Sequence, residues 1–107
     1  MSESDESREA REAREAGESQ SARFTIVNDL GLHARAATKL VQLASRFPCE
    51  VTVSHEGQTA NAKSVMGVLL LCGSKGTVVE VRAVGLRSDE CVVALGDLIA
   101  QRFGESS

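Results

Sequence analysis

The chain contains no tryptophan and no tyrosine, and only three of its 107 residues are phenylalanine. It therefore lacks an aromatic platform on which nucleobases could stack, and its core has to be built mainly from aliphatic side chains. Positive charge is not in excess either, because the formal net charge is −3. A protein that binds a phosphate backbone normally carries a basic surplus. Both absences argue against nucleic-acid binding.

Cysteine is scarce, and the three cysteines, Cys49, Cys72 and Cys91, form no Cys-x-x-Cys pair and stand near no histidine cluster. This pattern predicts reduced packing residues rather than a disulfide framework or a zinc site. No apolar run reaches the length of a membrane span, and the N-terminus is polar and acidic. We therefore expect a cytoplasmic protein that neither enters a membrane nor binds a metal or other cofactor.

Residues 1–22 differ in composition from the rest of the chain. They hold seven acidic residues and three arginines, a charge of −4, and the triplet Arg-Glu-Ala is repeated three times between Arg8 and Ala16. No large apolar residue follows Met1 before Phe24, so this stretch cannot bury enough surface to offset the entropy of ordering it. We interpret 1–22 as a disordered acidic extension, with a fraying helix as the alternative, and 23–107 as the folded domain.

The remaining sequence alternates between the two regular periods, two for strands and 3.6 for helices. Strands are predicted at Arg23–Val27, Glu50–Ser54, Gln58–Ala62 and Thr77–Val84, and helices from Ala34 to Phe47-Pro48, from Val65 to about Leu71 and from about Ser88. His55 falls in the hairpin turn between the second and third strands, where we expect a plain exposed residue. This order predicts an α+β domain whose helices cover one face of an antiparallel sheet.

One glycine-containing turn, Asn28 to Gly31, carries a histidine to the start of the first helix. His33 stands immediately before the apolar positions Ala37 and Leu40 that define the buried face of this helix. The first N–H groups of a helix lack intrahelical acceptors and its dipole is positive there, so anions are stabilised at this end. The same field disfavours imidazolium and favours a neutral, nucleophilic His33 near pH 7.

Arg35 adds a planar set of donors that suits phosphoryl oxygens. Phosphoryl transfer depends mainly on positioning and charge stabilisation, so a reversibly phosphorylated His33 fits this arrangement. On residue type alone, a histidine that only caps or packs at a helix start is the commoner case.

The stretch Gly31-Leu32-His33-Ala34-Arg35-Ala36-Ala37 resembles the active-site motif of HPr, the histidine-containing phosphocarrier family of the phosphoenolpyruvate-dependent phosphotransferase system. A second stretch, Lys63-Ser64-Val65-Met66-Gly67-Val68, resembles the regulatory-serine motif of that family at the separation the family uses. The likeness runs from about Arg23 to the C-terminus. One position departs from it, because Ala36 stands where the family usually has proline, and alanine gives up roughly 0.4–1 kcal/mol of rigidity.

The resemblance implies the open-faced β-sandwich of HPr, with four antiparallel strands and three helices on one face. It also implies that His33 is the phosphoryl acceptor, forming pros-phosphohistidine on Nδ1, and that Arg35 stabilises the phosphoryl group. The implied partners are enzyme I, enzyme IIA proteins and a serine kinase/phosphorylase, all meeting a monomer that carries phosphoryl groups but is not an enzyme on its own.

Ser64 is well placed to cap the short helix that begins at Val65, which by itself explains a serine there. The family motif adds a regulatory reading, since a phosphoryl group would bring about −1.5 to −2 charge to this helix end. The helix is too apolar to be buried on every side, so we expect Met66 and Leu69 to face outward and help to dock partners, while Val68 and Leu71 join the core. The rival to a carrier is an HPr-type regulatory interaction module that signals through Ser64 or His33.

Overall fold

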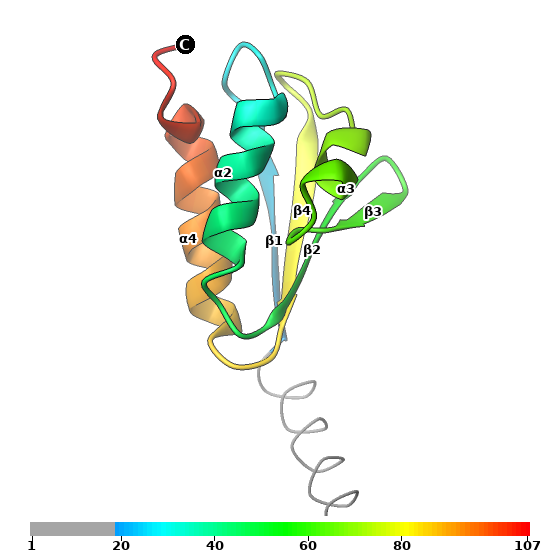
Figure 1. The fold of residues 1–107 in the computed structure, drawn as a ribbon, viewed down its shortest axis with the longest axis vertical. Coiled ribbons are helices and arrows are strands. Elements are labelled where there is room, and N and C mark those ends of the chain that lie inside the picture. Colours follow the sequence, from blue (N-terminus) through cyan, green and yellow to red (C-terminus); the bar gives the residue numbers. More distant parts are fainter. Residues whose placement is uncertain (1–18) are drawn as a thin grey trace, which may run out of the picture.

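The computed structural model describes residues 19–107 (Figure 1). Its elements follow in the order β1 (Ser19–Thr25), α2 (Ala34–Ala44), β2 (Glu50–His55), β3 (Gln58–Asn61), α3 (Val65–Leu70), β4 (Val78–Val84), α4 (Ser88–Ala100) and the 3₁₀ turn η1 (Arg102–Gly104). The first 18 residues of the expected acidic extension lie outside the described part. None of the helices in that part is long and apolar enough to cross a membrane.

The four strands form one sheet in the order β1-β4-β2-β3, and every neighbouring pair is antiparallel. The last strand in sequence, β4, therefore lies in the middle, with the first strand on one side of it and the β2–β3 hairpin on the other. Figure 1 shows α2, α3 and α4 on one face of this sheet. The predicted α+β architecture, a four-stranded antiparallel sheet with three helices, is confirmed.

The core lies between the helices and the covered face of the sheet. Alternate strand residues point into it, as the period of two predicts, and the helices contribute one stripe each. The largest fully buried side chains are mostly aliphatic and include Leu40, Val53, Val81, Leu95 and Ile99. Phe103 is also fully buried and anchors the segment that follows α4.

The N-terminal boundary predicted from the sequence is wrong by four residues. Ser19–Ala22, which composition assigned to the extension, form the first half of β1 and pair with β4 from Ser19↔Val84 to Ala22↔Val81. Strand pairing uses backbone groups, so a polar stretch can join a sheet when a neighbouring strand offers an open edge. Composition alone does not show whether a neighbouring strand has an open edge.

The end of one helix also differs from the prediction. α2 ends at Ala44 rather than at Phe47, because the N–H groups of Arg46 and Phe47 turn back to the carbonyls three residues earlier. Phe47 remains buried beyond the helix. At the other end of the chain, Phe103 lies in η1, after α4 has ended at Ala100, and has a φ of 54°.

His55 is not the exposed turn residue that the sequence predicts. The turn itself consists of Glu56 and Gly57, both with positive φ, and His55 still pairs with Gln58 as the last residue of β2. It shares the odd-numbered, covered face of this strand with Val51 and Val53. Its side chain is accordingly only 11% exposed.

Candidate functional site

The turn before α2 is held by its own backbone and by the loop that follows α3. Asn28 is fully buried, and its side-chain amide donates to the carbonyl of Gly31 at 2.8 Å. Gly31 has a φ of +65°, and a Cβ added there would lie 2.4 Å from the carbonyl oxygen of Gly73. The N–H of Leu32 donates to that same oxygen at 2.7 Å. Only glycine fits at position 31, and this close contact fixes where the next residue begins the helix.

His33 is the N-cap residue of α2, with extended backbone angles (φ −74°, ψ 179°). Its Nδ1 accepts a hydrogen bond from the N–H of Arg35 at 3.3 Å, while its carbonyl accepts the first helical bond from Ala37. The side chain is 25% exposed, so the ring is both held in place and reachable from solvent. The capping alternative is thus correct as a description of the geometry, and it leaves Nδ1 at the electropositive end of the helix.

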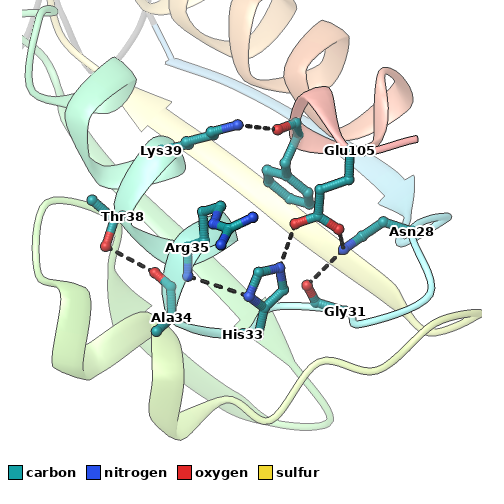
Figure 2. A network of polar contacts seen from close by, with 9 residues as sticks. Asn28, Gly31, His33, Ala34, Arg35, Thr38, Lys39 and Glu105 are labelled. Atoms are coloured by element: carbon teal, nitrogen blue, oxygen red, sulfur yellow. Dashed lines mark hydrogen bonds and ion pairs between the residues drawn. The ribbon is translucent and has the colours of Figure 1, made fainter. Parts of the chain in front are cut away.

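The other ring nitrogen of His33, Nε2, contacts the carboxylate of Glu105 (Figure 2). The second oxygen of this carboxylate accepts from the side-chain amide of Asn28 at 3.1 Å. The hydrogen bond from His33 is the main reason that the pKa of Glu105 lies below its usual value, with the Asn28 bond and the charges of His33 and Arg35 acting in the same direction. An ionised carboxylate can only accept, so we assign the ring proton to Nε2 and leave Nδ1 unprotonated, with its lone pair toward the N–H of Arg35.

Two cations belong to the same end of α2. The Arg35 side chain is exposed, and its guanidinium forms no hydrogen bond or ion pair with any other residue of 19–107. Lys39, one turn further along, donates to the carbonyl of Phe103 at 2.7 Å (Figure 2). Both line a surface hollow of about 380 Å³, together with Leu30 and the C-terminal residues from Gly104 onward. The hollow therefore brings two cationic side chains and the carboxylate of Glu105 together beside the ring.

Backbone donors add to these charges. Ala34, Arg35 and Ala36 precede the first intrahelical hydrogen bond, so their N–H groups have no acceptor within the helix. Ala36 is fully buried, so it packs well at the position where the resembling family has proline. In the part of the chain that the structure covers, no group of three or more potential metal ligands comes together. The site thus offers a nucleophilic nitrogen, N–H donors and a guanidinium, which is a set suited to a phosphoryl group.

Ser64 caps α3, as predicted. Its Oγ accepts from the N–H of Gly67 at 3.1 Å. Val68 and Leu71 are buried and Met66 is 65% exposed, which also agrees with the prediction. Leu69, however, is partly buried against the core, and Leu70 is the exposed residue at 69%.

Helix geometry alone does not separate Leu69 from Leu70. At 100° per residue, with Val68 and Leu71 facing the core, these two residues lie at about the same angle, roughly 50°, on either side of the outward direction. Leu69 is half-buried because it packs against the core cluster, whereas Leu70 remains exposed. The exposed large apolar residues of this helix are therefore Met66 and Leu70, not Met66 and Leu69 as predicted.

The His33 turn contacts the loop that follows α3, at the end of this helix that is remote from Ser64. The loop after α3 supplies Gly73, which contacts Leu32 immediately before His33. Ser64 lies at the opposite end of α3, roughly 9 Å away along the helix axis at 1.5 Å per residue. His33, Arg35 and Glu105 thus form one cluster, and Ser64 stands outside it.

Glu105 and Lys39 are site residues that sequence reasoning missed. Glu105 is 72 positions from His33 and follows a glycine, so no local pattern marks it as a partner of the ring. Only the reversal of the chain after α4 brings it back to the start of α2. Lys39 carries a weak signal, because it lies one helical turn after Arg35.

The fold and this site define a class of small α+β protein that presents a histidine at a helix N-terminus, between backbone donors, an arginine and a carboxylate. Residues 20–101 match the family model described as the phosphotransferase-system HPr component phosphorylation site. The chain is 48% identical over 83 residues to the phosphocarrier protein HPr of Xylella fastidiosa, and the aligned part covers 78% of this chain and 93% of that one. HPr of Cupriavidus necator is also 48% identical, over 76% of this chain and 91% of that one.

Solved structures give the same result. The crystal structure of HPr-C-His from Thermoanaerobacter tengcongensis superposes with a TM-score of 0.79 at 41% identity, covering 82% of this chain and 99% of that one. The chain belongs to the HPr family of phosphocarrier proteins of the phosphotransferase system. The sequence resemblance is thereby confirmed.

Proposed function

We propose that this protein accepts a phosphoryl group on Nδ1 of His33 from enzyme I and passes it to enzyme IIA proteins. One observation carries the proposal. Nδ1 faces the N–H of Arg35 at the helix N-terminus, while Nε2 is engaged by Glu105. The unprotonated ring nitrogen is therefore the one beside the anion-stabilising donors.

Arg35 is the second residue of the proposed site. Its guanidinium has no partner among residues 19–107, so it can turn its paired N–H groups toward the phosphoryl oxygens. Because the phosphoryl group leaves again to a partner protein, the chain acts in stoichiometric amounts and is not a stand-alone catalyst.

Partners would dock on exposed apolar side chains near the histidine. Leu30 on the His33 turn is 69% exposed, and Met66 and Leu70 project from α3. Exposed large apolar side chains of this kind mark interaction surfaces, and both donor and acceptor proteins need access to the same ring.

The test is phosphorylation in vitro with phosphoenolpyruvate and a purified enzyme I, followed by intact-mass analysis. The wild type should gain one acid-labile phosphoryl group. His33→Ala should gain none, whereas His55→Ala, which removes the other histidine of the chain, should behave as wild type. A labile phosphoryl group on His33→Ala would show that the acceptor is elsewhere.

A regulatory interaction module is the second candidate, and the Ser64 cap favours it. Ser64 Oγ sits at the start of α3 beside the exposed Met66, so a phosphoryl group there would place charge on the proposed docking surface. Incubation with a serine kinase/phosphorylase would separate the two roles, because phosphoserine survives acid and phosphohistidine does not.

We further propose that the protein works as a cytoplasmic monomer. All three cysteines are free, and Cys72 is exposed, which suits a reducing compartment. Size-exclusion chromatography with light scattering tests the monomer directly.

A further inference from the structure

The last four residues, 104–107, form a C-terminal strap across the His33 turn. Arg102, Phe103 and Gly104 all have positive φ, at 58°, 54° and 79°, and reverse the chain after α4. The buried Phe103 ring anchors this reversal. At its far end the strap accepts a hydrogen bond at the carbonyl of Ser107 from the N–H of Asp29, at 3.1 Å.

The strap holds one carboxylate in a fixed orientation. Glu105 lies between the two ends of the strap, and its side chain is only 13% exposed. Asn28 donates both to this carboxylate and to the carbonyl of Gly31, so the amide that orients Glu105 is itself immobilised by the turn. The carboxylate is therefore aimed at Nε2 of His33 by groups other than the histidine.

We propose that Glu105 is a positioning residue that keeps the proton on Nε2 of His33 through the whole transfer cycle, so that phosphoryl groups arrive and leave only through Nδ1. This inference rests on the phosphocarrier function proposed above. It assigns to the strap a chemical role in addition to its packing.

The transfer balances without any proton moving at His33. The lone pair of Nδ1 forms the new N–P bond while the N–P bond of the donor histidine breaks and returns its electron pair to the donor nitrogen. Positive charge then develops on the His33 ring, and the carboxylate of Glu105 stabilises it through Nε2–H. In the onward step the lone pair of the acceptor histidine on the partner protein forms a new N–P bond, the Nδ1–P electrons return to Nδ1, and His33 leaves as neutral imidazole.

Loss of the Nε2 proton would change the leaving group. A phosphorylated ring without this proton has to leave as imidazolate, which is a much poorer leaving group than imidazole. Glu105 would therefore extend the pH range over which phosphorylated His33 stays reactive. The other charged groups around this contact are Arg35, Lys39, Arg102 and the Asp29–Lys75 pair, and all of them remain in the variant described next.

The experiment compares Glu105→Gln with wild type and with Asp29→Asn. The control also removes one carboxylate, from the turn that the strap crosses, where Asp29 pairs with Lys75 at 2.7 Å and does not touch the ring. Each protein is phosphorylated with phosphoenolpyruvate and enzyme I, and phosphoryl loss is followed by intact mass from pH 5 to pH 10. As the pH rises, the rate of phosphoryl loss should begin to fall about one pH unit earlier in Glu105→Gln than in wild type, which is the size of effect that an adjacent opposite charge produces. Asp29→Asn should follow wild type.

A second readout does not depend on phosphorylation. Ring ¹⁵N NMR of the unmodified proteins should show the Nε2–H tautomer in wild type and Asp29→Asn, and an increased share of Nδ1–H in Glu105→Gln. Identical pH profiles for wild type and Glu105→Gln would overturn the inference and leave the carrier function intact. If wild type takes up no phosphoryl group, the carrier proposal fails instead, and the tautomer comparison alone then decides whether Glu105 holds the proton.

Discussion

At His33 the two ring nitrogens meet opposite kinds of group. Nδ1 accepts from the backbone N–H of Arg35, and Nε2 contacts an ionised carboxylate. A histidine with this asymmetry has one defined tautomer, and the side of the ring that can act as a nucleophile is determined before any partner arrives. Sequence predicts half of this arrangement, because a helix start is a local pattern. The other half depends on a contact across 72 positions.

Arg35 gives the first prediction at this scale. Arg35→Lys should slow phosphoryl transfer about tenfold, because a point charge replaces the paired donors of the guanidinium. The melting temperature should stay the same, since the side chain is exposed. Stopped-flow or quench measurement of transfer from phosphorylated enzyme I checks the rate. The matched control is Arg46→Lys, because Arg46 is an exposed arginine beyond the other end of α2. Equal transfer rates for the two variants would show that Arg35 has no role beyond that of a surface residue.

Glu105 gives a prediction about acid stability. Its folded-state pKa lies below the ordinary value, chiefly through the His33 hydrogen bond, so the ionised form favours the native state. The stabilisation is fully present above the unfolded-state pKa of about 4.3, and it is lost as the pH falls through the folded-state pKa. Urea unfolding from pH 7 to pH 3 should show wild type more stable than Glu105→Gln at neutral pH, with the difference shrinking below about pH 4. A constant difference would mean that the carboxylate is not stabilised in the fold.

At the scale of single elements, the sequence predicts the strands and helices well wherever apolar periodicity is strong. Each strand of the β2–β3 hairpin and each helix was expected within a few residues of its observed bounds. The predictions fail where contact with a neighbouring element determines whether a residue is in a strand or is buried. Ser19–Ala22 become strand because β4 offers an edge, and Leu69 is half-buried because it packs against the core cluster. Such outcomes depend on tertiary contacts, which a single sequence does not display.

The α3 cap carries the prediction that belongs to this scale. Ser64→Asp should keep the cap and the stability, because aspartate also accepts from the N–H of Gly67, yet it should slow acceptance of the phosphoryl group from enzyme I by adding charge beside Met66. Ser64→Ala should do the reverse, losing about 0.5–2 kcal/mol of unfolding free energy with little effect on transfer. Thermal melts and transfer rates at low ionic strength compare the two. Transfer by Ser64→Asp at the wild-type rate would leave Ser64 as a helix cap with no switching role.

At the scale of the whole molecule, strand β1 already includes Ser19 in the described residues, and this changes where we expect the chain can be cut. Deletion of residues 1–18 should leave the melting temperature nearly unchanged, because that stretch holds no large apolar residue after Met1. Deletion of residues 1–22 should lower it by about 5–10 °C, because the pairs Ser19↔Val84 to Ala22↔Val81 are lost. Differential scanning calorimetry of both truncated proteins distinguishes them. A large drop on removing only 1–18 would show that the acidic extension packs on the domain.

The position of β4 between β1 and β2 also has a consequence for the order of folding. The β2–β3 hairpin closes through a two-residue turn, whereas each β1–β4 pair joins residues 53 to 65 positions apart. Long loops close late because their entropy is lost before any contact compensates for it. We therefore expect Val81→Ala in β4 to slow refolding and Ala22→Gly in β1 mainly to speed unfolding, as stopped-flow chevron plots would show. The strand that leads into the His33 turn would then be the last to dock, and the geometry of the phosphoryl acceptor would be set in the final step of folding.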